Sequence, residues 1–67
     1  MKINKLKLQI AMANALMSIK TLANKARMDA GSISHIMAKG GNCKQITAGK
    51  IAKALGVDVK EIIDAEP

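Results

Sequence analysis

One local pattern begins four segments of this 67-residue chain and indicates that the chain is built from helices. In each case an apolar residue precedes a capping side chain, and another apolar residue follows four positions after the cap. This spacing is typical of a helix N-cap with a hydrophobic staple. The pattern occurs at Ile3-Asn4-Leu8, Met17-Ser18-Leu22, Met28-Asp29-Ile33 and Val57-Asp58-Ile62.

Two further signals complete the set of helix starts and stops. Asp58 and Glu61 form a capping box, and Asn42 with Gln45 predicts another one. Gly40-Gly41 and Gly56 are expected to end helices, because glycine adopts the left-handed conformation there. The chain is therefore expected to be one all-α domain over 1–67, near the lower size limit for a lone core. The predicted helices span 4–15, 18–25, 29–38, 43–55 and 58–64.

Helical spacing assigns an inward face to each predicted helix. No Phe, Tyr or Trp is present, so the core must consist of aliphatic and methionine side chains. The expected core residues are Leu6, Ile10, Ala13, Leu22, Ala23, Ala26, Ile33, Ile36, Met37, Ile46, Ile51, Ala52, Leu55, Ile62 and Ile63. Leu8, Met12 and Leu16 fall on the far side of the first helix and are expected to be surplus apolar surface.

Charge is unevenly distributed along the chain. The net charge is +6, residues 1–28 contain no acid, and residues 57–67 contain four of the five acids. This asymmetry indicates a polyanionic partner on one face, although a merely soluble lysine-rich surface is an alternative. A single cysteine excludes an intrachain disulfide, and no signal peptide or membrane span is recognisable. We therefore expect a cytoplasmic protein with no membrane partner.

Three predicted helices have lysines in their opening turns, where the helix dipole favours acids by about 0.3–1 kcal/mol each. The lysines concerned are Lys5 and Lys7, Lys20, and Lys44. A phosphate at each helix start would give both the lysine and the free backbone N–H groups a partner. The alternative is that exposed lysines simply tolerate so small a penalty.

The segment from Met17 onward has the spacing of a helix-turn-helix and resembles a known family. Small Ala23 would let the two helices cross closely. Inward positions would be taken by Leu22, Ala26, Met28, Ile33 and Ile36. The stretches SIKTLANKARMDAGSISHIM and TAGKIAKALGVDVKEII resemble the phage repressor/Cro-type (XRE-like) helix-turn-helix family, ungapped from Met17 to Ile63. The resemblance implies a compact five-helix lambda-repressor-like domain, usually a homodimer, that regulates transcription in a bacterial or phage-infected cell without catalysis or cofactor.

The same resemblance assigns roles to individual residues. Base-facing roles fall on Asp29, Ala30, Gly31 and His35, with Ser32 and Ser34 near the DNA backbone. Phosphate-facing roles fall on Ser18, Lys20, Lys39, Asn42 and Lys44.

Three positions depart from the family pattern. Ile19 stands where the family often has a Gln that braces the recognition helix. Arg27 replaces the usual turn glycine. This turn position normally needs a left-handed backbone, which costs a non-glycine residue conformational free energy. Gly40, Gly41 and Cys43 replace a more basic, proline-bearing loop.

Other chemistry finds little support in the residues. A zinc site at His35 is disfavoured because no second His and only one Cys are present. His35 is expected to be exposed, as a base or phosphate contact or as a plain surface residue. Cys43 is expected to be inert rather than a redox sensor. No nucleophile–base pair, paired carboxylates or phosphate loop can be assembled, so we expect no enzyme and no small-molecule substrate.

Two functions remain open. The first is a sequence-specific regulator that binds double-stranded DNA as a homodimer. The second is a protein-interaction module that modulates a larger repressor and reads DNA weakly or not at all. The first turn of the predicted reading helix, Ala30-Gly31, and the apolar far side of the first helix favour the second function. The lysines at helix starts favour the first.

Overall fold

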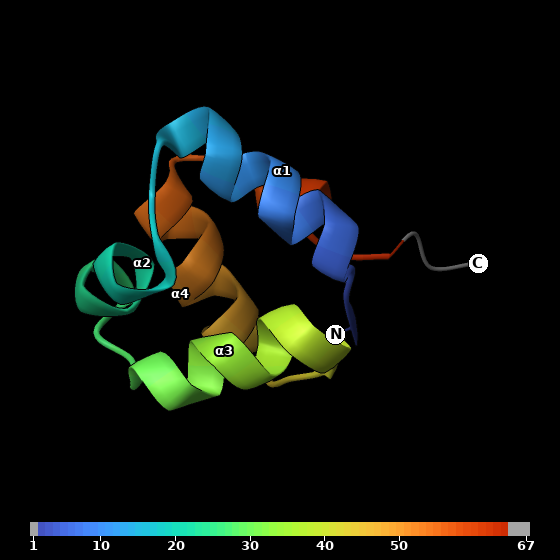
Figure 1. Ribbon diagram of the computed structural model, residues 1–67. Helices are drawn as coiled ribbons and strands as arrows, with labels where there is room; N and C mark the ends of the chain where they lie inside the picture. Colours follow the sequence, from blue (N-terminus) through green and yellow to red (C-terminus); the bar gives the residue numbers. More distant parts are fainter. Residues whose placement is uncertain (1, 65–67) are drawn as a thin grey trace.

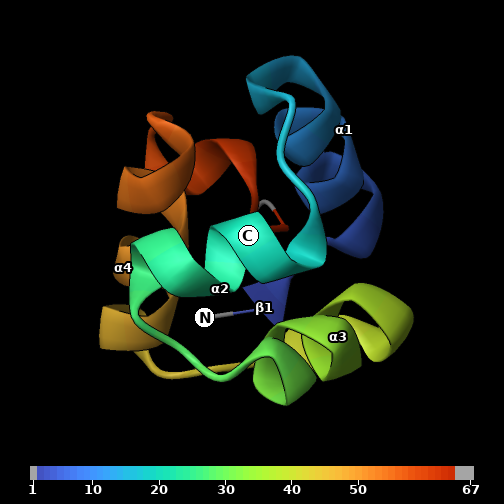
Figure 2. The same cartoon turned by 60° about the vertical axis from the view of Figure 1, so that its left-hand side comes forward.

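The computed structural model describes residues 2–64 and contains four α-helices, a pair of two-residue strands and one 3-10 turn (Figure 1). The elements in chain order are β1 (Lys2–Ile3), α1 (Lys5–Ala15), α2 (Ile19–Ala26), α3 (Ala30–Lys39), β2 (Gly41–Asn42), α4 (Gln45–Leu55) and the 3-10 turn η1 (Val59–Glu61). Helix α4 packs against α2 and η1, while α3 lies along one edge of the molecule against α1 and α2 (Figures 1 and 2). No helix in residues 2–64 is long and apolar enough to cross a membrane.

A single aliphatic core holds these elements together. Its fully buried large side chains are Ile3, Leu8, Leu22, Ile33, Ile51 and Ile62. Each belongs to a different segment of the fold, and each contributes about 1.5–3 kcal/mol when removed from water. Small buried residues, Ala23 on α2 with Ala48 and Ala52 on α4, leave room for these two helices to approach each other.

Strand β1 joins the two ends of the described chain. It pairs antiparallel with β2, with Lys2 opposite Asn42 and Ile3 opposite Gly41. On its other side Ile3 forms a bridge with Ile63, and the Asp64 amide donates to the Lys2 carbonyl at 3.0 Å. The C-terminal segment is therefore held against β1.

The predicted fifth helix is wrong, and with it the five-helix lambda-repressor-like architecture. The predicted capping box does form, because the Asp58 amide donates to Glu61 Oε2 at 3.1 Å. However, only the turn Val59–Glu61 follows it. The Ile62 carbonyl accepts from the Asn4 amide at 2.9 Å, and Ile63 pairs with Ile3. The backbone groups of residues 62–64 thus bond to the segment around β1 instead of to a helix. The all-α prediction holds only in that the domain is mostly helical.

Helix α1 buries the face opposite to the one predicted. Leu8 and Met12 are buried, whereas Leu6 is 62% exposed, Ile10 is 53% exposed and Ala13 is exposed. Because α1 is apolar on nearly all sides, its periodicity does not select a face. The strand before it does, since burial of Ile3 fixes the direction from which the chain enters the helix.

The start of α4 also differs from the prediction. Asn42 belongs to β2, so the predicted capping box with Gln45 is wrong. The helix begins at Gln45, its N-cap Lys44 makes no side-chain capping bond, and Ile46 is 71% exposed rather than inward. The remaining core predictions are confirmed as buried or half-buried: Leu22, Ala23, Ala26, Ile33, Ile36, Met37, Ile51, Ala52, Leu55, Ile62 and Ile63.

The connection between α2 and α3 is the three-residue turn Arg27–Asp29. Arg27 has a φ of 56°, which confirms the left-handed conformation predicted at this position. Leu16, which ends α1, has the same φ and is 92% exposed, and its conformation was not predicted. Gly56 ends α4 with a φ of 74°, as predicted.

We predict that Arg27→Gly raises the melting temperature. A non-glycine residue in this conformation costs about 1 kcal/mol relative to glycine. In a domain this small, that amount corresponds to roughly 4–8 °C in thermal unfolding followed by circular dichroism.

Gly56→Ala is the matched control, because a Cβ at Gly56 would meet nothing within 4 Å and would change only the backbone preference. Its melting temperature should fall by a similar amount. A drop for Arg27→Gly would mean that the arginine side chain stabilises the fold more than its backbone strains it.

Candidate nucleic-acid interface

Helix α3 presents a narrow outward ridge. Ile33 is fully buried, with Ile36 and Met37 half-buried beside it, so the residues opposite this face are exposed. Gly31 and His35, spaced by four residues, lie on that opposite side. The structure leaves exposed the predicted base-facing residues and the two serines expected beside them near the DNA backbone: Asp29, Ala30, Gly31, His35, Ser32 and Ser34.

The first turn of α3 is shaped by its cap. Asp29 precedes the helix, and its Oδ2 accepts from the Ser32 amide at 3.2 Å. A Cβ at Gly31 would lie 2.7 Å from this same oxygen, so the glycine gives the capping carboxylate its space. Asp29 is therefore partly committed to the helix, and the polar groups of the ridge are concentrated farther along α3, around His35.

A shallow groove of about 440 Å³ runs between α3 and the segment before α4. It brings Asp29, Gly31, Ser32 and His35 together with Asn42. Ala30 and Ser34 do not line it. The groove also includes Met28, Ile36, Cys43 and Thr47.

The start of α2 carries exposed Ser18 and Lys20 and no acid in its first turn. The Ser18 hydroxyl caps the helix by accepting from the Thr21 amide at 3.1 Å, and it lies 3.0 Å from Thr21 Oγ1. Ile19 packs against the core, so it cannot act as the bracing Gln of the family does. An anion here would be held by Lys20 and the first backbone N–H groups of the helix.

The start of α4 is the more open of the two helix ends. Its N-cap, Lys44, makes no side-chain capping bond, and its first turn also lacks an acid. The first N–H groups of α4 therefore have no side-chain cap, and a lysine is exposed beside them. Lys39 is exposed in the last turn of α3, where its positive charge interacts favourably with the negative end of the helix dipole. Asn42 is exposed within β2.

The start of α1 does not fit the expectation of a phosphate. Asp64 accepts from the side-chain amide of Asn4, the N-cap of α1, at 2.6 Å. The Lys7 ammonium donates to the Ile63 carbonyl at 3.2 Å. Residues 63–64 thus supply an acid and a carbonyl at the start of α1. The premise that this helix start lacks such partners is therefore wrong for Asn4 and Lys7.

The predicted phosphate-facing residues form two groups. Ser18 and Lys20 lie at the start of α2, and Lys39, Asn42 and Lys44 lie between the last turn of α3 and the start of α4. Figure 2 shows α3 along one edge, with the start of α2 on one side of it and the start of α4 on the other.

Ala38 and Thr47 were assigned no role from the sequence, and Met28, Ile36 and Cys43, which also line the groove, were not expected at this surface. Exposed Ala38 shares the ridge with Gly31 and His35, which its seven-residue spacing from Gly31 could have indicated, and Thr47 lines the groove.

Within residues 2–64, no group of three His, Cys, Asp or Glu side chains is placed to hold a metal ion. Comparisons with known protein families, with characterised proteins and with solved structures found no match. The resemblance of residues 17–63 to phage repressors therefore remains a prediction from the sequence.

Proposed function

We propose that this protein is a DNA-binding transcriptional regulator that inserts α3 into the major groove. The observation that carries the proposal is the exposed α3 ridge between two helix starts that each have a lysine and no acid in the first turn. Free N–H groups at a helix start, together with a lysine, are the usual partners of DNA phosphates. The exposed ridge, with His35 at its middle, is the surface that would meet the base edges.

Sequence discrimination by this ridge should be modest. A bidentate contact from Arg, Asn or Gln contributes about 1–3 kcal/mol of discrimination, and the segment 29–38 contains none of these residues. The exposed Ala30 can contact a thymine methyl, and Gly31 allows close approach of the backbone. We therefore expect a preference of about a thousandfold over random DNA, much of it through DNA shape.

Lys20→Ala and Lys44→Ala test the phosphate contacts. Each should weaken binding to all duplexes alike and lower the slope of log affinity against log salt by about 0.9 per contact. The measurement is a fluorescence anisotropy titration of labelled duplex at several salt concentrations. Lys60→Ala, in η1, is the control and should leave the slope nearly unchanged. Equal slopes for all three variants and the wild type would contradict the proposal.

His35→Ala tests base reading. It should flatten the preference at one or two base pairs of each half-site while leaving affinity for mixed-sequence DNA unchanged, because it removes a base contact and no cationic phosphate partner. Selection from a randomised duplex pool measures both. Ala30→Gln should instead change which bases are preferred. If neither variant altered a preference that the wild type shows, α3 would not be the reading helix.

We propose a homodimer as the active form. The exposed face of α1 supplies the residues that would lie between the two copies. Leu6 and Ile10 are large apolar residues, both more than half exposed on one face of α1. Two-fold symmetry would place two α3 helices about 34 Å apart, facing successive major grooves of one duplex. Of the three residues on the far side of the predicted first helix, expected to be surplus apolar surface, Leu8 and Met12 are buried in the core and only Leu16 is exposed.

Leu6→Gln with Ile10→Gln should convert the dimer to a monomer and weaken binding to a two-half-site duplex far more than to a single half-site. Analytical ultracentrifugation with and without DNA measures the first effect, and anisotropy measures the second. A wild type that stays monomeric on a two-half-site duplex would exclude the dimer.

A second candidate function is a module that binds a larger repressor protein. Exposure of Leu6 and Ile10 together with the small first turn Ala30-Gly31 supports it. Salt-dependent DNA binding that requires Lys20 and Lys44 would favour the regulator. Its absence in the pure protein would favour the interaction module.

A further inference from the structure

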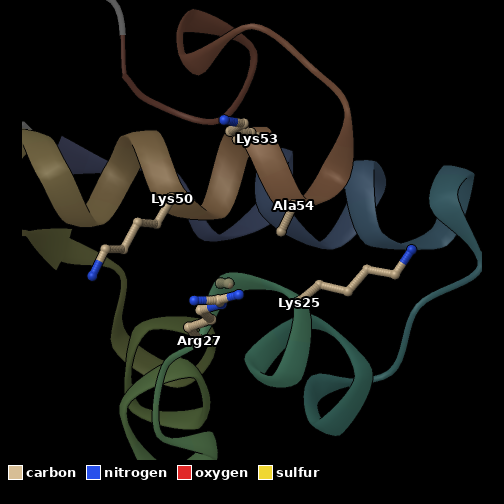
Figure 3. Close-up of a pocket in the computed structure, with 6 residues that line it drawn as sticks. Lys25, Arg27, Lys50, Lys53 and Ala54 are labelled. Carbon is tan, nitrogen blue, oxygen red and sulfur yellow. The ribbon is translucent and has the colours of Figure 1, made fainter.

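A second groove lies between α2 and α4, apart from the α3 surface (Figure 3). It has a volume of about 680 Å³ and is lined by Lys25, Ala26, Arg27, Lys50, Lys53 and Ala54. It shares no lining residue with the groove beside α3. The turn between the helices separates the two, because Arg27 lines one groove while Met28 and Asp29 line the other.

Four of the six lining side chains are cationic, and all four are exposed. Lys50 and Lys25 extend toward opposite ends of the groove with Arg27 between them, so these three charges form a row, and Lys53 lies off this row beside α4 (Figure 3). Within the described part of the chain the one ion pair joins Lys2 to Asp64, so none of these four cations has a carboxylate partner there.

Stabilisation of the helices does not explain all four of these cations. Lys25 and Lys53 lie in the last turns of α2 and α4, where a positive charge opposes the helix dipole favourably. Lys50 lies in the middle of α4, three residues from Lys53, a spacing at which like charges repel. Arg27 is the C-cap of α2, where its charge also interacts favourably with the helix dipole, although glycine would suit its left-handed backbone better. Lys50 therefore adds charge to the groove without stabilising the fold.

The chemistry of the groove favours one class of ligand. Its other two lining residues are alanines, which offer neither a pocket for an apolar side chain nor a hydrogen-bonding group. A row of cations beside small side chains suits a chain of regularly spaced negative charges that presents nothing else to recognise. The phosphodiester backbone of a nucleic acid is such a chain.

We propose that the groove between α2 and α4 binds nucleic-acid backbone as a second contact beside the α3 surface. This inference rests on the proposed function only in taking DNA as the partner. The backbone could belong to the duplex segment flanking the one that faces α3, or to a second duplex.

The test compares two variants of equal net charge. The groove pair combines Arg27→Asn with Lys50→Gln; asparagine tolerates the left-handed backbone well. The control pair combines Lys7→Gln with Lys60→Gln, which remove two cations near η1. With mixed-sequence duplex, the groove pair should lower the salt slope by about two units, at about 0.9 per phosphate contact, and the control pair by less than one.

Two further measurements separate ligand binding from a structural role. The charge-conserving pair Arg27→Lys with Lys50→Arg should restore the wild-type slope. The groove pair should keep or raise the melting temperature, because it relieves repulsion between cations. Equal slopes for the groove and control pairs, or a loss of binding that follows a loss of folded protein, would overturn the inference.

Duplex length identifies the source of the backbone. If a flanking segment is bound, the effect of the groove pair appears with a duplex of about 36 bp and is absent with one of about 12 bp, roughly three turns and one turn. If a second duplex is bound, it appears with both lengths, and the protein brings donor- and acceptor-labelled short duplexes together. Polyglutamate binding that is lost in the groove pair, with DNA binding unchanged, would assign the groove to acidic peptide and overturn the inference.

The lysine variants at the starts of α2 and α4 keep the two proposals distinguishable. If Lys20→Ala and Lys44→Ala lower the salt slope and the groove pair does not, this inference fails and the proposed function stands. If only the groove pair lowers it, the groove is the DNA site and the role of α3 fails.

Discussion

The packing of one large aliphatic side chain from each segment into a common core is the constraint on which the other features depend. Ile33 is the contribution of α3, and its complete burial sets the rotation of that helix. Gly31 and His35 face outward for this reason. A large-to-small change at such a site costs about 2–5 kcal/mol, a large part of the 5–15 kcal/mol by which a typical protein is stable. The ridge of α3 is thus positioned by the core.

Features governed by neighbouring residues could be predicted from the sequence. The caps at Asn4, Ser18 and Asp29 form as expected, because each needs only a side-chain oxygen and an amide three residues later. Helices α2 and α3 and the turn between them are also found where they were predicted. Their apolar residues recur at helical spacing, as Leu22 and Ala26 do on α2 and Ile33 and Ile36 on α3. The exposure of every proposed contact residue on α3 follows from the same periodicity.

Features governed by distant segments could not be predicted. Asn42 pairs with β1 instead of capping α4. Residues 62–64 bond to the segment Lys2–Asn4 instead of forming the end of a fifth helix. Helix α1 is apolar on opposite sides, so only its tertiary partners choose between Leu6 and Leu8. The partner at the start of α1 could not be predicted for the same reason, because Asp64, which bonds to Asn4, is 60 residues away in the sequence.

Strand β1 also has a consequence for the order in which the protein can form. Asn4 and its partner Asp64 are 60 residues apart, and Ile3 lies between β2 and Ile63. The residues that bond to β1 and Asn4 at 62–64 are therefore synthesised about 60 residues after the strand itself. The β1–β2 pair needs only residues up to Asn42, whereas the bridge from Ile3 to Ile63 and the buried Ile62 side chain require a chain that includes residues 62–64. The four helices are local structures, yet the domain that they form becomes complete only once residues 62–64 have been synthesised.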